Sequence, residues 1–307
     1  MRDAFIRTLT HLATENPNVI LITGDLGFGV LTDFAKRFPR QFFNAGVAEQ
    51  NMTSLAAGLA LEGKVVFTYS IANFPILRCL EQIRNDVLYH NTNVKIVSVG
   101  AGLGYGSLGM SHHATEDLAI LRALPGMTVV APGDVIEAEL ATRAVYATPG
   151  TFYLRLGMVN GWSAYEQPPE FKLGKAIPLF QQGEIAFLST GPNLKNVLEA
   201  RALLAGKNIQ AQVYSVPTVS PIDRPLVEAL ARATRLIVTV EDHQENGGLG
   251  GAVSEVLAEC RYGRALLLRI GLRSFASAVG SQDYLREFYG LSPTRIAERT
   301  EKALAVL

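Results

Sequence analysis

Short apolar runs alternate with helical patterns along almost the whole of this 307-residue chain. The runs are rich in Val, Ile and Leu, as in Val19–Ile22 and Val94–Val99. Continuous apolar runs of this length are typical of parallel strands that are buried on both faces. Between them, apolar residues recur at helical spacing, for example over residues 2–15 and 134–146. Strands and helices that alternate in this way predict an α/β fold with parallel, doubly wound sheets.

The predicted elements form two α/β units, separated by residues 158–173, which break the pattern and are interpreted as a linker. The first unit is then residues 1–157 and the second is residues 174–307, and each is long enough to build its own core. The predicted strands are 19–22, 41–43, 65–69, 94–99, 127–130 and 152–156 in the first unit and 185–188, 210–214, 236–240 and 266–270 in the second. The predicted helices are 2–15, 49–60, 76–89, 116–124 and 134–146, then 194–204, 226–232, 249–259, 284–288 and 293–304.

Charge and hydropathy exclude several classes of protein. Lys+Arg and Asp+Glu both number 28, and this zero net charge argues against a general binder of nucleic acid or anionic membranes. No apolar run reaches membrane-spanning length, and the N-terminus lacks a signal-peptide pattern, so we expect a cytoplasmic protein. Cys79 and Cys260 are far apart and lack metal-ligand spacing, which favours reduced thiols.

Glu49 lies in the stretch Asn44–Met52, between an aromatic strand and a small-residue helix pattern over Thr53–Ala60. This spacing places Glu49 in the first turn of a helix, at the carboxyl end of a short strand. In open α/β sheets that edge is where ligands bind. The helix N-terminus alone also stabilises a carboxylate there, so a structural interpretation of Glu49 stays open beside the functional one.

A long glycine-rich loop follows the predicted strand 94–99 and carries His112 and His113. Gly104–Gly109 satisfies the G-x-G-x-x-G pattern, but the loop runs on to the histidines instead of opening a helix, which argues against NAD binding. A zinc site would need further ligands at suitable spacing. Imidazole titrates near neutrality, so a proton donor or a substrate hydrogen-bonder is the better hypothesis, with capping or simple exposure as the alternative.

Aromatic and basic side chains are predicted at the same edge of the sheet. Phe67, Tyr69 and Phe74 cluster near the end of one strand, where aromatic side chains either pack in the core or hold a flat ring by stacking. Arg78 and Arg155 lie near the same edge and are candidates for binding an anionic substrate group.

A second glycine-rich turn, Glu241–Gly251, begins a predicted helix in the second unit. Backbone N–H groups at a helix start suit an anion. The turn contains acids and no phosphate-binding lysine, which argues against a P-loop and favours a structural or interface role.

Taken together, these residues resemble the C-terminal half of the transketolase family of thiamine-diphosphate enzymes. The resemblance covers essentially the whole chain, and its most specific part is the G-V-A-E-Q stretch around Glu49, followed at this distance by the G-M-S-H loop that ends at His112. It implies that residues 1–157 are a pyrimidine-binding domain and residues 174–307 a transketolase C-terminal domain. The matching pieces are Gly24–Leu26, Gly46–Met52, Glu81–Asp86, Gly109–His112, Thr218–Asp223 and Glu241–His243.

The resemblance also implies a role for each candidate residue. Glu49 would hydrogen-bond N1′ of thiamine and so make the neighbouring 4′-amino group basic enough to remove the C2 proton. His112 would face the reacting centre. The implied cofactor contacts are Glu49, Asp25, Leu26, Phe67, Tyr69 and Phe74, with Ile71 an alternative for one aromatic position, and the implied substrate contacts are Arg78, His112, His113 and Arg155.

One part of the family pattern is missing from this chain. The family binds Mg²⁺ and the diphosphate through a G-D-G motif with a downstream Asn, whereas this chain has Thr23-Gly24-Asp25-Leu26. We therefore expect no metal site in this chain and a partner subunit, equivalent to the family's N-terminal half, that holds Mg²⁺ and the diphosphate. The expected assembly is a heterotetramer in which this chain also self-associates, without nucleic acid or membrane.

The predicted activity is that of a transferase that moves a two-carbon unit, ketol or acyl, from a ketose phosphate or a 2-oxo acid to a carbonyl acceptor. Sugar-phosphate transketolases typically carry an Asp where this chain has Leu108, and a further His where it has Gly100–Gly102. Leu108 offers no hydrogen bond to a substrate hydroxyl, so ordinary ketose phosphates are expected to be poor donors and pyruvate is a candidate. The alternatives are the β subunit of a 2-oxo acid dehydrogenase or decarboxylase, and a non-catalytic assembly subunit.

Overall fold

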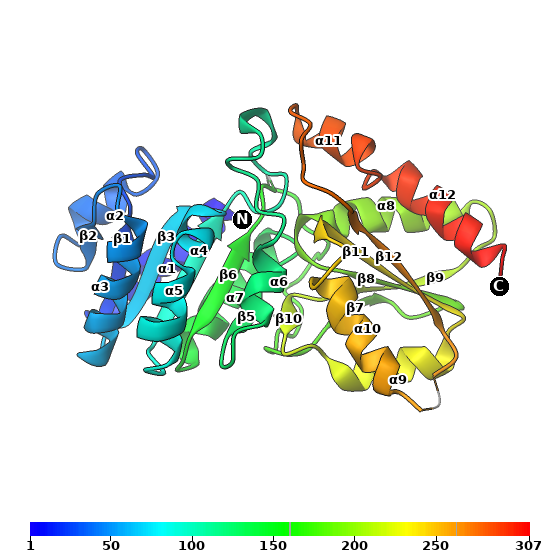
Figure 1. Cartoon of the computed structure of the whole chain (residues 1–307), viewed down its shortest axis with the longest axis horizontal. Coiled ribbons are helices and arrows are strands. Elements are labelled where there is room, and N and C mark those ends of the chain that lie inside the picture. Colours follow the sequence, from blue (N-terminus) through cyan, green and yellow to red (C-terminus); the bar gives the residue numbers. More distant parts are fainter. Residues whose placement is uncertain (160, 262) are drawn as a thin grey trace.

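The computed structural model describes residues 1–159, 161–261 and 263–307, and places two β-sheets side by side, each with helices on both faces (Figure 1). The first sheet consists, from edge to edge, of β10 (Thr218–Ser220), β5 (Thr128–Val130), β6 (Phe152–Leu156), β4 (Val94–Val99), β3 (Val65–Ile71), β1 (Val19–Thr23) and β2 (Phe42–Asn44). The second consists of β12 (Leu266–Leu272), β11 (Leu236–Gln244), β8 (Ile185–Ser189), β9 (Ala211–Ser215) and β7 (Ile177–Phe180).

Most neighbouring strands pair in parallel, which confirms the predicted α/β class. Strands β1, β3, β4 and β6 form the centre of the first sheet, and all their carboxyl ends meet at one edge. Among the described residues two strands run the other way, β10 against β5 and β7 against β9. Neither is predicted from the sequence, because such short edge strands carry no clear periodicity. Strand β10 follows the predicted linker in the sequence, yet it completes the first sheet.

Helices bury apolar side chains against both faces of the first sheet. The elements on one face are α1 (Arg2–Glu15) and α7 (Val135–Ala147), with α2 (Thr32–Arg37) at the edge. The elements on the other face are α3 (Glu49–Leu61), α4 (Phe74–Leu77), α5 (Leu80–Gln82), the π-helix η1 (Ile83–Leu88) and α6 (Asp117–Arg122). The single helix predicted over residues 76–89 is therefore wrong, because α4, α5 and η1 replace it, and α2 is not predicted at all.

The second sheet is covered in the same way. Helices α8 (Leu194–Ala205), α11 (Gln282–Phe288) and α12 (Pro293–Leu304) pack on one face, and α9 (Arg224–Ala233) and α10 (Leu249–Glu259) on the other; the 3₁₀ turns η2 (Gly106–Leu108) and η3 (Gly191–Asn193) lie in loops. Within the described residues, every helix is too short or too polar to span a bilayer.

The two units share one core. A single cluster of buried apolar side chains runs from Met52 and Val66 in the first unit to Leu249 and Val253 in the second. Close packing of this kind resists small displacements of one unit against the other. The loops at the carboxyl edge of the first sheet are therefore held in a fixed position relative to the second unit.

Candidate active site at the carboxyl edge of the first sheet

Glu49 is the first residue of α3, and only 4% of its surface is exposed. Gly46, whose φ of 72° lies in the left-handed region that favours glycine, turns the chain between β2 and this helix. Nη1 of Arg78 lies 3.1 Å from Oε2 of Glu49 and donates a hydrogen bond to it, which compensates for burial of the carboxylate. Oε1 accepts no hydrogen bond from the described residues, so one oxygen is available for a ligand.

A chain of side-chain contacts connects Glu49 with His112. The guanidinium of Arg78 lies over the ring of Phe74, with its Cζ 4.5 Å from the ring centroid. The Phe74 ring meets the His112 imidazole at a centroid distance of 5.2 Å, and the Tyr105 ring lies 6.1 Å from the same imidazole. The structure therefore brings four of the predicted residues, Glu49, Phe74, Arg78 and His112, together at the edge where ligands bind in α/β sheets.

Ser111, the residue before His112, orients the His112 ring. Nδ1 of His112 lies 2.9 Å from Oγ of Ser111, and the Ser111 carbonyl accepts a hydrogen bond of 2.8 Å from Nδ2 of Asn73, which follows β3. His112 is half-buried, so its ring remains accessible to a ligand. One nitrogen is occupied locally, which leaves Nε2 as the atom that can meet a substrate.

His113 points away from this group. Its side chain is buried, and Nδ1 donates a hydrogen bond of 3.2 Å to the Ala276 carbonyl of the second unit. Burial lowers the pKa of His113, which favours the neutral ring. This placement argues against the prediction that His113 contacts substrate.

Asp25 and Leu26 lie at the carboxyl end of β1, beside the start of α3. Asp25 is exposed with a φ of 56°, and Asn44 of β2 fixes it by donating to Oδ1 over 2.9 Å and accepting from the Asp25 backbone N–H over 3.0 Å. The Leu26 carbonyl accepts a hydrogen bond of 3.1 Å from the Thr23 hydroxyl. Their contacts with a cofactor remain a prediction, and both residues lie at the sheet edge where that prediction places them.

Phe67 and Tyr69 lie on the opposite face of the first sheet from Glu49. Side chains alternate along a strand, and both rings face α1, where their centroids are 6.0 Å and 6.1 Å from that of Phe5. Phe67 is fully buried one pleat below the edge, so the structure argues against it as a wall of a cofactor site. Tyr69 lies nearer the edge, where burial raises the pKa of its hydroxyl, and its role remains a prediction.

Arg155 is not available to a substrate. Its side chain is completely buried between the two units, where Nε contacts Oδ2 of Asp117 at 2.7 Å and Nη1 contacts Oδ1 of Asp242 at 2.9 Å. Nη2 donates to the Ala114 carbonyl at 2.9 Å, so each guanidinium nitrogen has a protein partner. Burial alone would lower the pKa of Arg155, but the two carboxylates raise it above its ordinary value. This placement argues against the prediction that Arg155 binds substrate, because its side chain joins the two units.

The Glu241–Gly251 turn has a structural role, as predicted. The Glu241 carboxylate accepts hydrogen bonds from the backbone N–H groups of Leu249 and Gly250, at 2.7 and 2.8 Å, and so occupies the N-terminus of α10 where an external anion would otherwise bind. Among the described residues, no group of three or more His, Cys, Asp and Glu side chains could hold a metal ion.

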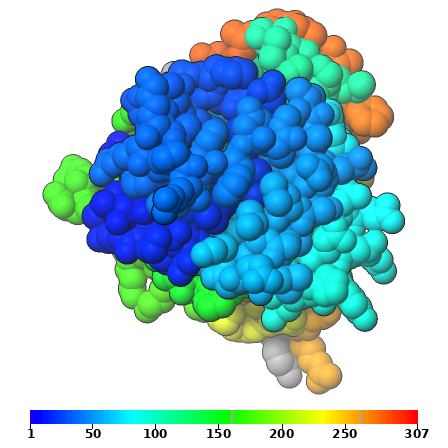
Figure 2. All heavy atoms as spheres, turned by 90° about the vertical axis from the view of Figure 1, so that its left-hand side faces the viewer, coloured from blue at the N-terminus to red at the C-terminus, as the bar shows by residue number. Residues whose placement is uncertain are grey.

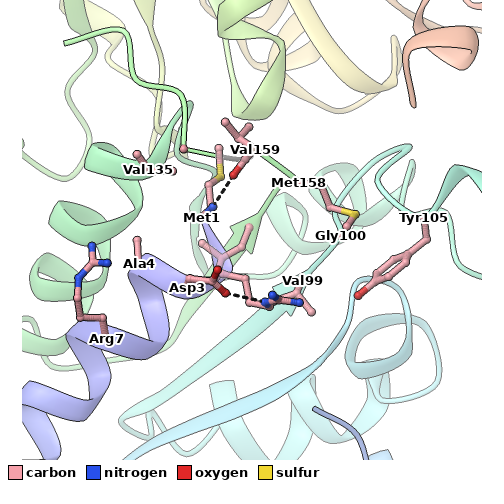
Figure 3. A pocket seen from close by; sticks show the side chains of 14 residues that line it. Met1, Asp3, Ala4, Arg7, Val99, Gly100, Tyr105, Val135, Met158 and Val159 are labelled. Atoms are coloured by element: carbon pink, nitrogen blue, oxygen red, sulfur yellow. Dashed lines mark hydrogen bonds and ion pairs between the residues drawn. The ribbon is translucent and has the colours of Figure 1, made fainter. Parts of the chain in front are cut away.

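A cavity of about 390 Å³ adjoins the candidate site through Tyr105 (Figure 3). It lies between the first turn of α1 and the carboxyl ends of β4 and β6, and Arg2, Asp3 and Met158 line it. Arg2 and Asp3 form an ion pair of 2.9 Å at this wall. Sequence patterns do not identify Arg2 or Tyr105 as site residues. Arg2 begins α1 and Tyr105 lies in the glycine-rich loop after β4, and these two segments meet only in the folded chain.

Comparison with known proteins identifies the family of the chain. Residues 1–160 match the family model described as transketolase, pyrimidine binding domain, and residues 174–296 match transketolase, C-terminal domain. The chain is 37% identical over 260 residues to a subunit of the apulose-4-phosphate transketolase of Phocaeicola vulgatus, covering 84% of this chain and 83% of that protein. It is 35% identical to 1-deoxy-D-xylulose-5-phosphate synthase 1 of Geobacter sulfurreducens, covering 97% of this chain and 47% of that protein.

A solved structure has the same fold over nearly the same length. The chain of a split gene transketolase, described as an inactive beta4 tetramer, superposes with a TM-score of 0.89 at 35% identity and covers 99% of this chain and 97% of its own. The two domain matches and this superposition identify the same family as the sequence resemblance. The chain belongs to the transketolase family.

Proposed function

We propose that this chain is the pyrimidine-binding subunit of a two-chain, thiamine-diphosphate-dependent transferase that moves a two-carbon unit between carbonyl compounds. The observation that carries the proposal is the buried Glu49 carboxylate with one uncommitted oxygen, joined through Arg78 and Phe74 to His112. A carboxyl group, an aromatic ring and an imidazole at one sheet edge match what the aminopyrimidine of the cofactor needs: a hydrogen-bond partner, an apolar wall and a nearby proton carrier.

Each residue has a separate task in this proposal. When bound, thiamine diphosphate supplies the carbon nucleophile that attacks the carbonyl of the donor. Glu49 hydrogen-bonds the pyrimidine nitrogen through its free oxygen, and Arg78 keeps the carboxylate in place through the other. Phe74 forms an apolar wall, and Nε2 of His112 exchanges a proton with the substrate oxygen.

The cavity beside Tyr105 is the proposed location for the part of the substrate that does not react. Tyr105, whose ring lies 6.1 Å from the His112 imidazole, lines this cavity, and the Arg2 guanidinium, although paired through Nε with Asp3, keeps Nη1 and Nη2 for an anionic substrate group. Leu108 and Met110 are 52% and 60% exposed on the same loop and offer no hydrogen bond to a hydroxylated donor. A small 2-oxo acid therefore stays a candidate donor beside a ketose phosphate.

The diphosphate and Mg²⁺ are proposed to be held by a partner subunit. Large apolar side chains are exposed on the elements that flank Glu49; they are Phe28, Phe43, Val47, Leu55 and Leu77, with exposed fractions of 79, 40, 76, 37 and 49%. Figure 2 shows the end of the molecule that the N-terminal segments, in blue, form. Exposed apolar surface of this extent is typical of subunit interfaces. A partner bound to this surface would face the free oxygen of Glu49.

Calorimetry of thiamine diphosphate binding tests the proposal. The partner chain is sought as the product of a neighbouring gene with a G-D-G motif and a downstream Asn. We expect weak binding to this chain alone and tight, Mg²⁺-dependent binding to the mixture of the two chains. Tight Mg²⁺-dependent binding to the isolated chain would contradict the division of the site, and no binding to the mixture would contradict the cofactor.

A further inference from the structure

The loop of residues 100–113 is held by the second unit at its tip as well as at its base. At the tip, the Gly280 backbone N–H donates a hydrogen bond of 3.1 Å to the Gly106 carbonyl, and at the end of the loop Nδ1 of His113 donates one of 3.2 Å to the Ala276 carbonyl. In Figures 1 and 2 the teal loop and the orange segment before α11 lie side by side at the top of the molecule. His112 thus belongs to the first unit in sequence, but its loop rests on the second.

Two glycines show how closely the loop fits against the second unit. A methyl group on Gly106 would lie 2.5 Å from the Gly280 carbonyl oxygen, and a methyl group on Gly102 would overlap the Asp242 carboxylate. Asp242 is itself fixed by the buried ion pair with Arg155. The backbone of the loop is therefore in direct contact with the second unit at both positions, where no side chain could be accommodated without a shift.

His113 makes the side-chain contact with the second unit, at the end of the loop. His113 is 3% exposed, and the bond from its Nδ1 joins it to Ala276, which lies 163 residues further along the chain, while Nε2 has no hydrogen-bond partner among the described residues. A buried ring donor is expensive to leave unpaired, so the bond fixes the backbone at residue 113 relative to residues 275–280. Because His112 is the preceding residue, the same bond fixes the point from which its imidazole extends.

We propose that the second unit holds His112 in its working position, and that His113 is the positioning residue that transmits this constraint. The proposal rests on the proposed function, in which His112 exchanges a proton with substrate. Displacement of a reacting group by about 1 Å can cost on the order of 100-fold in rate. Loss of the His113 bond should therefore act on turnover, while cofactor binding through Glu49 and Phe74 stays unchanged.

The experiment compares His113→Leu with His113→Asn in the reconstituted two-chain enzyme. Leu removes the donor, whereas the Nδ2–H₂ group of Asn occupies nearly the place of the imidazole Nδ1–H and restores it. We expect kcat to fall by roughly 10- to 100-fold in His113→Leu and to recover most of that loss in His113→Asn, with the thiamine diphosphate Kd within about twofold of wild type in both. Equal kcat for His113→Leu and wild type would overturn the proposal, as would an Asn variant no better than Leu.

A second variant tests the same contact without touching His113. Gly106→Ala places a methyl group between the loop and Gly280 and should lower kcat in the same way, whereas Gly251→Ala, which adds a methyl group at ordinary contact distance from Arg122, is the matched control. Amide hydrogen exchange of residues 103–112 in the chain without cofactor should accelerate in Gly106→Ala and His113→Leu but not in the control. Unchanged exchange and unchanged kcat in Gly106→Ala would contradict the proposal.

Failure of the proposed function gives a different result. If the wild-type two-chain mixture neither binds thiamine diphosphate nor transfers a two-carbon unit, the proposed function is wrong, whatever the loop does. If the wild-type enzyme is active and His113→Leu, His113→Asn and Gly106→Ala all turn over normally, only the positioning role is wrong.

Discussion

Replacement of Arg155 by Met is predicted to weaken the junction between the two units strongly. Met fills much of the same volume but leaves Asp117 and Asp242 buried without the guanidinium that they contact at 2.7 and 2.9 Å. Removal of one partner from a buried ion pair typically costs about 3–5 kcal/mol of unfolding free energy. The matched control is Arg235→Met, because Arg235 pairs with Glu184 at 3.2 Å on the surface, where a salt bridge contributes about 0–1 kcal/mol.

The cost of Arg155→Met should depend on pH in a defined direction. Burial raises the pKa of Asp242 in the folded chain, and Arg155 opposes this effect, so loss of Arg155 raises that pKa further. A carboxyl group with a raised folded pKa contributes stability at low pH and loses it as the pH rises through that pKa. The variant should therefore be closer to wild type at pH 5 than at pH 8.

Urea denaturation of both variants at fixed protein concentration measures these effects. We expect a loss of about 3–5 kcal/mol for Arg155→Met at pH 8 and of less than about 1 kcal/mol for Arg235→Met. A loss equal to that of the control would refute the structural interpretation of Arg155. A stable Arg155→Met variant whose KM for an anionic substrate rises sharply would restore the interpretation as a substrate-binding residue.

Three further predictions concern the site, the substrate and the response to pH. Arg78→Ala removes the donor to Glu49, so turnover of the two-chain enzyme should fall by roughly tenfold, or about 1.4 kcal/mol, and unchanged turnover would remove Arg78 from the site. Because Leu108 offers no hydrogen bond, pyruvate should be a better two-carbon donor than xylulose 5-phosphate, and efficient ketol transfer from xylulose 5-phosphate to ribose 5-phosphate would show that Leu108 does not determine the donor. Burial raises the pKa of Glu137 to about 7, so the unfolding free energy should fall as the pH rises through 7, by at most about 1.4 kcal/mol per pH unit from this residue. Glu137→Gln should reduce this slope in denaturant titrations at pH 6 and 8, and an unchanged slope would exclude Glu137 as its source.

The central elements of the fold are predictable from sequence because their signals are local. Strand β4 and helix α12 have the predicted bounds, since a buried apolar run and an amphipathic pattern with a Ser292 cap define them directly. Strand β10 is not predictable in this way, because its three residues gain their pairing from β5, which lies far away in the sequence. The predicted helix over residues 76–89 fails because apolar spacing alone does not distinguish an α-helix from short α-helical turns followed by a π-helix.

In the candidate site, too, local features are predictable from sequence and contacts between distant residues are not. The motif around Glu49 places its carboxylate at the sheet edge, because a helix start after a strand is a local feature. Which face a neighbouring aromatic occupies depends on strand register, and this is why Phe67 falls on the α1 face while Phe74, beyond the strand, reaches Arg78 and His112. Arg155 looks like an exposed anion-binding residue in sequence, because its two carboxylate partners come from α6 and β11.

Turnover of the Glu49→Gln variant in the reconstituted two-chain enzyme tests the central claim most directly. Gln keeps the size of the side chain and removes its ability to exchange a proton with the cofactor, and Glu62→Gln, on an exposed residue at the other end of α3, is the matched control. We predict a loss of about 10²–10⁴-fold in kcat for Glu49→Gln, with folding and subunit assembly unchanged, and wild-type kcat for the control. Turnover of Glu49→Gln close to that of the control would contradict the assignment of Glu49 as the residue that activates the cofactor.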